Sequence, residues 1–190
     1  SIVCTVAGIC RLCTGRTSCQ NGVAAVSRVA VLYNPVQVTQ KGLLANIETA
    51  APSLGVQVIA AGARDADDVK RVIDDFANTP AGGMIVLPNP ITIANRGQII
   101  ALLAHHRMPA VYNMPVFARE GGLVSYGADD AAQYRQAASY IDRILKGAKA
   151  ADLPVQQATK FEFIINLKTA RALGLTVPSA ILTLADELID

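Results

Sequence analysis

The 190-residue chain has no tryptophan, and aromatic residues make up only 5% of it. Platforms on which nucleic-acid bases stack are therefore scarce, although a single tyrosine at a binding site is compatible with this composition. Charged residues account for 17%, with 17 basic against 15 acidic side chains, so no basic surface for nucleic acid is expected. Hydrophobic residues reach 52%, enough for one full core, but no apolar run approaches the roughly 18 residues of a membrane-spanning helix. We therefore expect a folded, soluble chain that has no nucleic-acid partner.

All four cysteines lie in the first 27 residues, at positions 4, 10, 13 and 19. One Cys-x-x-Cys pair flanked by two more cysteines can bind zinc, but the second such pair that makes this pattern strong is lacking. Zinc, disulfides and cysteines without a shared role all remain open, and we favour the last, with no metal and no cofactor. The start of the chain has no basic-then-apolar leader, so localisation is not readable from it.

Short apolar runs alternate with helical patterns from Arg28 onward. They predict four strands, at 28–32, 56–61, 84–87 and 109–112, and three helices, at 42–54, after an Asp65 cap, and at 94–106. Parallel neighbours need such crossover helices, so the pattern predicts a three-layer α/β/α fold with a mainly parallel sheet. No dinucleotide fingerprint and no phosphate-binding loop follows these strands, which disfavours a nucleotide enzyme.

The pattern changes after Gly121-Gly122. A strand is predicted at 123–126 and a long helix from Asp129 or Asp130 to about Lys146, closed by Gly147. A linker at 148–157, a strand at 160–166, a helix at 167–173 and a last apolar turn after Pro178 complete the chain.

Five stretches resemble the periplasmic component of an uncharacterised family of ABC-type transport systems, with the type I periplasmic-binding fold; they are residues 28–35, 82–90, 121–127, 134–147 and 151–175. The resemblance implies a solute-binding protein of an importer, which binds a small organic solute such as an amino acid between two lobes, in the periplasm, and which has a membrane permease as its partner. Residues 28–190 resemble the C-terminal lobe, with a return segment at 121–147 that crosses back to the first lobe. Residues 1–27 do not match a first lobe.

Ligands of open α/β sheets bind at the carboxyl ends of the strands. The loops there supply candidate ligand-binding residues, and the family pattern adds three more from the cleft or hinge; together they are Asn34, Pro35, Asn89, Pro90, Thr92, Asn113, and Tyr112, Tyr126, Asp129. Side-chain amides suit a small polar or zwitterionic solute. Each of four candidates has a structural alternative. Asn34 and Asn89 can be turn residues before proline, Tyr126 can be a packed strand residue, and Asp129 can be a helix cap.

No enzyme constellation is found. His105 and His106 are adjacent at the end of a helix and so point about 100° apart, and Ser125 lacks the first glycine of a nucleophile elbow. Two other functions remain open: a cytoplasmic effector-binding sensor or regulator core of the same fold, and, from fold alone, a flavodoxin-like enzyme.

The return segment 121–147 carries an apolar stripe that a first lobe covers in the family. In this chain we expect the stripe to be buried against something else, and self-association is the expected outcome. The residues of the stripe are Leu123, Tyr134, Ala138, Ile141 and Leu145.

Overall fold

The fold is described from a computed structural model, which covers residues 26–78, 82–155 and 158–190. The cysteines at 4, 10, 13 and 19 lie outside the described residues. The strands are β1 (Arg28–Tyr33), β2 (Gln57–Gly62), β3 (Gly82–Val86), β4 (Ala110–Tyr112), β5 (Val124–Ala128), β6 (Phe161–Asn166) and β7 (Glu187–Ile189). The α-helices are α2 (Val38–Ala50), α3 (Ala66–Ala77), α4 (Pro90–Ala94), α5 (Arg96–His105), α6 (Pro115–Arg119), α7 (Asp130–Leu145), α8 (Leu167–Ala172) and α9 (Ser179–Leu182), with 3-10 turns η1 (Ala51–Leu54) and η2 (Ala150–Asp152).

All of the strands lie in one sheet, in the order β2-β1-β3-β4-β5-β6-β7. The first five run parallel, β6 pairs antiparallel with β5, and β7 is parallel to β6. The predicted α/β fold with a mainly parallel sheet is thus confirmed, including the shared sheet of the first four strands.

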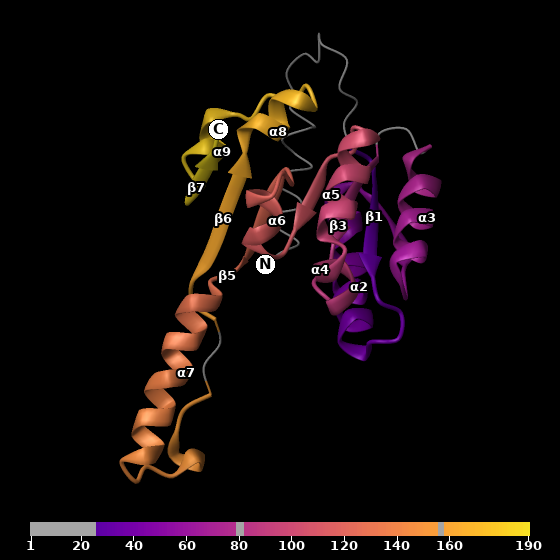
Figure 1. The fold of residues 1–190 in the computed structure, drawn as a ribbon. Coiled ribbons are helices and arrows are strands. Elements are labelled where there is room, and N and C mark those ends of the chain that lie inside the picture. Colours follow the sequence, from indigo (N-terminus) through magenta and orange to yellow (C-terminus); the bar gives the residue numbers. More distant parts are fainter. Residues whose placement is uncertain (1–25, 79–81, 156–157) are drawn as a thin grey trace.

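Helices cover both faces of the sheet, because successive strand residues point to opposite sides. Val29 and Val31 of β1 point toward α2, where Leu44 and Ile47 complete one core cluster. Ala30 and Leu32 point to the other face, which is covered by α3, α5 and α6 with side chains such as Ile73, Leu103 and Phe117. Figure 1 shows these helices on either side of the strands, as the three-layer prediction requires.

One helix prediction was wrong in its bounds, and one short helix was not predicted. The first helix begins at Val38 rather than Gly42, because a turn closed by the Gln37 N–H on the Asn34 carbonyl, at 3.2 Å, starts the helix earlier. The helix expected at 94–106 is α5, but the short helix α4 before it was missed: Pro90 takes its first position, where the missing N–H costs nothing, and Asn95 separates α4 from α5.

The end of the chain contains a strand that the sequence did not predict. β7 has only three residues, and Asp186 joins it to β6 by accepting a hydrogen bond from the Phe163 N–H at 2.8 Å and donating its own N–H to the Phe163 carbonyl at 2.8 Å. The sequence gives little indication of a strand here, because β7 has only three residues and follows an aspartate. Its pairing with β6 therefore could not be predicted from sequence.

The return segment divides between the sheet and solvent. β5 pairs with β4 and β6, and Leu123 is buried in the core cluster that includes α2 residues, so the strand has its partners within this chain. α7 has no buried residue, and Figure 1 shows it running away from the sheet, with the chain returning beside it to β6. Within the chain only Leu123 of the stripe is buried, so burial of the other stripe residues by self-association stays a prediction.

Candidate functional site

One edge of the sheet collects most of the candidate residues. Because β1, β3, β4 and β5 are parallel, the loops that follow them all emerge at their carboxyl ends. β6 runs the other way, so its start, at Lys160 and Phe161, lies at this same edge. We call this the carboxyl edge, and α7 projects beyond it (Figure 1).

Asn34 and Asn89 are tied together by Gln40, a buried residue of α2 that sequence reasoning missed. The Gln40 Oε1 accepts the Asn34 N–H at 3.0 Å and the Asn89 Nδ2 at 3.5 Å, and its Nε2 donates to the Pro88 carbonyl at 2.6 Å. A glutamine near a helix start has no periodic or motif signal, so only the packing reveals it. The loops after β1 and β3 are thus fixed relative to each other.

The side chains of Asn34 and Asn89 also serve their own loops. The Asn34 Oδ1 accepts the Val36 N–H at 2.9 Å, which is the turn weighed from sequence. The Asn89 Oδ1 accepts the N–H groups of Ile91 and Thr92, at 2.9 and 3.0 Å, and the Thr92 hydroxyl accepts the Asn89 N–H in return, as a capping box. Asn89 and Thr92 are buried, whereas Pro90 is exposed and Pro35 is half-buried.

The loop after β4 places Asn113 at the surface of the edge and Tyr112 in the core. Tyr112 stacks on Phe117 at 4.7 Å between ring centroids, and burial raises the pKa of its hydroxyl. The Asn113 carbonyl lies against Gly127, where a Cβ would stand 1.8 Å from it. Asn113 itself is half-buried. The structure therefore separates these two neighbours, and only Asn113 belongs to the edge.

Tyr126 lies on the opposite face of β5 from Asp129. Its ring stacks on Phe161 at 5.6 Å and meets Phe163 edge-on at 6.2 Å. It packs beside the core cluster shared with α2 and α8, as a strand residue does. The sheet therefore lies between the stacked rings of Tyr126 and Phe161 and the side chain of Asp129.

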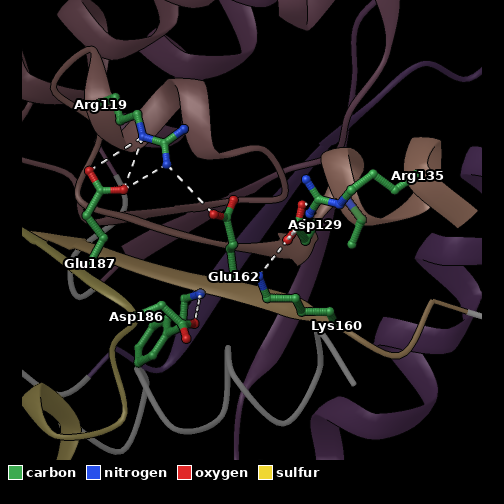
Figure 2. A network of polar contacts seen from close by, with 9 residues as sticks. Arg119, Asp129, Arg135, Lys160, Glu162, Asp186 and Glu187 are labelled. Atoms are coloured by element: carbon green, nitrogen blue, oxygen red, sulfur yellow. Dashed lines mark hydrogen bonds and ion pairs between the residues drawn. The ribbon is translucent and has the colours of Figure 1, made fainter.

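Asp129 caps α7 and pairs with two cations. Its Oδ1 accepts the Ala132 N–H at 2.9 Å, and its Oδ2 lies 2.8 Å from the Lys160 Nζ and 3.9 Å from the Arg135 Nη2. Figure 2 shows Lys160 and Arg135 approaching this carboxylate from two sides. The hydrogen bond from Lys160, followed by that from the Ala132 N–H, lowers the pKa of Asp129. The helix-cap alternative is confirmed, and the carboxylate is ionised at neutral pH.

One exposed side of α7 is apolar. The half-buried residues Ala132, Gln136 and Tyr140 share one side of α7, where the Tyr140 hydroxyl donates to the carbonyl of Pro154, in the chain that follows the helix, at 2.5 Å. The opposite side carries the stripe predicted from sequence, with Tyr134 77% and Leu145 82% exposed. Since residues 134, 138, 141 and 145 follow the spacing of one helix face, the stripe is continuous. We call it the α7 stripe; it consists of Tyr134, Ala138, Ile141 and Leu145.

Two further residues of the carboxyl edge were missed from sequence. Val36 and Val38, at the turn into α2, expose most of their apolar side chains next to Asn34. Exposure of a valine has no sequence signal, because the same residue type builds the core.

The remaining polar candidates take structural roles. The His106 Nε2 lies 2.8 Å from the Asp74 Oδ1, so this histidine joins α5 to α3. Ser125 is fully buried in β5, and its hydroxyl has no hydrogen-bond partner among the described residues. Within the same residues, no group of three His, Cys, Asp or Glu side chains is placed to hold a metal ion. Nor does any helix in the described part of the chain have the length and apolarity to cross a membrane.

Solved structures with the same fold are found in three bacteria. A conserved domain protein from Vibrio cholerae is 22% identical, with a TM-score of 0.84, and the matched region covers 98% of this chain and 60% of that protein. The ABC domain of Streptococcus pneumonia, solved in complex with L-Trp, is 21% identical, with a TM-score of 0.77, and the matched region covers 86% of this chain and 57% of that domain's chain. CD0873 from Clostridium difficile, a substrate binding protein with adhesive properties, was solved in a ligand-free, open structure. It is 19% identical, with a TM-score of 0.63, and the matched region covers 80% of this chain and 52% of that protein.

The chain thus spans 52 to 60% of the length of these three structures. Among proteins with a curated function, none matches it. The model of the family described as ABC transporter substrate binding protein matches residues 19–189, and this match begins before the boundary expected at Arg28. By this match, the chain belongs to the family of ABC transporter substrate-binding proteins.

Proposed function

We propose that this chain supplies one wall of the solute site of an ABC-type importer, in a cleft between this lobe and a second lobe. The observation that carries the proposal is the carboxyl edge, where the loops holding Asn34, Asn89 and Asn113 meet and beyond which α7 projects. The family consists of substrate-binding proteins that typically work in the periplasm or outside the cell and are typically not enzymes. We extend to this chain a periplasmic location, a membrane permease as partner and the absence of catalysis.

The edge suits a solute with both a polar and an apolar part. Asn34 and Asn89 hold their loops together through Gln40, so Asn113 is the amide we assign to direct contact with the solute. Val36 and Val38, which follow Asn34 in the chain, supply exposed apolar surface at the same edge. An amino acid with an apolar or aromatic side chain fits this combination, and one protein of the same fold was solved with L-Trp bound. Pro35, Pro90, Tyr126 and Asp129 then act as supports of the edge rather than as contacts.

The solute site is testable on the chain as it stands. A single wall offers few hydrogen bonds and little enclosure, so we expect a Kd in the millimolar range, which corresponds to about 4 kcal/mol. Amide chemical shifts in ¹⁵N NMR titrations with L-Trp, L-Leu and L-Asp give both affinity and location. Shifts at the loops after β1 and β4 for the two apolar amino acids support the proposal.

The matched variants are Asn113→Ala and Asn46→Ala, the second being an exposed asparagine of α2 away from the edge. Asn113→Ala should weaken binding several-fold, whereas Asn46→Ala should not. The absence of shifts at the edge at saturating millimolar amino acid, or an equal loss in both variants, would show that the site is misplaced.

The α7 stripe is the surface on which a second lobe packs in this proposal. For the chain alone, we propose that a second copy covers it, since its four residues, Tyr134, Ala138, Ile141 and Leu145, form one continuous row of uncharged, exposed side chains along α7. Two α7 helices packed side by side remove both stripes from water at once. In this proposal the α7 stripe is covered by the second lobe in the importer component and by a second copy in the chain alone.

Sedimentation velocity tests the association. We expect a concentration-dependent dimer that the double variant Ile141→Glu, Leu145→Glu converts to monomer. Leu184→Glu is the matched control, because Leu184 is 67% exposed on the lobe and outside the stripe. A monomeric wild-type chain, or equal dissociation by Leu184→Glu, would contradict this part of the proposal.

A further inference from the structure

The joint between α7 and the lobe is narrow. The chain leaves the sheet once, at the end of β5, and returns once, at the start of β6. The last ladder bond at this point is donated by the Asp129 N–H to the Lys160 carbonyl, at 3.0 Å. Since no side chain of α7 is buried, packing on the lobe does not set the direction of the helix.

The lobe side of this joint is rigid. β5 is held in place because the Asn113 carbonyl packs directly on Gly127 and leaves no space for a side chain there. β6 is held by its ladders with β5 and β7, and Arg119 of α6 adds ion pairs to both outer strands, with its Nη2 2.7 Å from Glu187 of β7 and 3.8 Å from Glu162 of β6. Figure 2 shows this row of charges continuing along β6 toward Lys160. Any change in the direction of α7 must therefore arise beyond Gly127 and Glu162, at Asp129 and Lys160.

One carboxylate joins the three pieces of chain that meet there. Asp129 accepts a hydrogen bond from the Ala132 N–H in the first turn of α7, and it forms ion pairs with the Lys160 ammonium of the returning strand and with Arg135 in the second turn of α7. Its side chain is only 8% exposed, whereas the side chains of Lys160 and Arg135 are mostly exposed. A cap alone uses one carboxylate oxygen, and the second oxygen is held by the two cations.

We propose that Lys160 and Arg135 are positioning residues, which act through Asp129 to fix the direction in which α7 leaves the lobe. Exposed ion pairs add little to stability, because solvent screens them and ordering long side chains costs entropy. Here the same contacts close a ring between the outgoing and the returning chain, so their effect is on orientation. Its consequence for solute binding rests on the proposed function: α7 sets where the second wall of the cleft stands.

Single-molecule energy transfer measures this orientation without solute. The dyes are attached at Glu48→Cys on α2 and Lys146→Cys at the far end of α7, both exposed positions, with the four native cysteines replaced by serine. Picomolar protein keeps the chain monomeric, so the α7 stripe does not interfere. We expect Lys160→Met to broaden the transfer-efficiency distribution about twofold, a sign of a helix that samples more directions.

Three further variants separate positioning from general stability. Asp129→Asn keeps an acceptor for the Ala132 N–H, because Asn is also a favoured cap, and it should broaden the distribution as well. Lys160→Arg should restore the narrow distribution. Lys70→Met removes a lysine with a comparable 2.7 Å ion pair, to Asp74 within α3, and should leave the distribution narrow.

A narrow distribution in Lys160→Met or Asp129→Asn overturns the proposal, and so does broadening in Lys70→Met. The melting temperatures of Lys160→Met and Lys70→Met should shift equally, whereas a purely structural role would lower only the first. Because no solute is present, these outcomes are independent of the NMR titrations that test the proposed function.

Discussion

Gln40→Met tests whether the two asparagine loops are held together by a buried amide. Methionine has a similar length but makes none of the three hydrogen bonds of Gln40. The change leaves the Asn34 N–H without its 3.0 Å acceptor and the Pro88 carbonyl without its 2.6 Å donor, whereas the Asn89 amide keeps its 3.4 Å bond to the Leu87 carbonyl. At roughly 1–3 kcal/mol for each buried group left unpaired, two such groups predict a loss of about 2–6 kcal/mol.

Urea denaturation followed by circular dichroism measures this loss at a fixed protein concentration. Gln98→Met is the matched control, since Gln98 is an exposed residue of α5, and its effect should stay within about 0.5 kcal/mol. The urea slope should remain unchanged in both variants, because neither alters the surface exposed on unfolding. If Gln40→Met falls within the range of the control, water replaces the amide and the loops are not held as described.

Three further predictions follow from burial and charge. Gly127→Ala should destabilise the chain by at least about 2 kcal/mol in the same urea assay, because its Cβ would stand 1.8 Å from the Asn113 carbonyl; a loss within error would show that β5 can shift. At a protein concentration that keeps the chain monomeric, Tyr112→Ala should cost about 3–5 kcal/mol and Tyr134→Ala less than about 0.5 kcal/mol, and equal costs would refute the assignment of Tyr112 to the core and Tyr134 to the surface. Because the folded-state pKa of Asp129 is lowered from 3.8, its charge stabilises the fold above that pH and the effect is lost as the pH falls through the folded value. The stability difference between wild type and Asp129→Asn should therefore stay constant between about pH 5 and 8 and vanish in acid, and a difference independent of pH down to pH 2 would contradict the sign.

Local patterns predicted the sheet because each strand is decided within a few residues. Val29 to Leu32 form an apolar run with no polar residue, which is stable only between two layers of helices, and the structure places them there. Asp65 and Asp129 precede helices, and their carboxylates cap them by accepting the N–H groups of Asp68 and Ala132. Such signals involve neighbours three or four residues apart, so no tertiary information is needed to interpret them.

The sequence predicted the location of the candidate site but not the role of each side chain in it. The rule that ligands bind at the carboxyl ends of parallel strands identified the loops of Asn34, Asn89 and Asn113, but it did not distinguish their side chains. Asn34 and Asn89 are tied inward by Gln40, which approaches Asn89 across 49 residues of sequence, and Asn113 is left at the surface. Contacts of that separation depend on how α2 packs against the end of β3, which no local pattern encodes.

The sequence by itself determined the fold class, the family and the apolar character of the α7 stripe, because these depend on residue type and spacing. Only the tertiary structure decided that Leu123 is buried while Tyr134, Ile141 and Leu145 stay exposed, since both groups have the same composition. The physical reason is connectivity: β5 finds hydrogen-bond partners in β4 and β6, whereas α7 is carried past the edge of the sheet, where none of the described residues of this chain covers the α7 stripe.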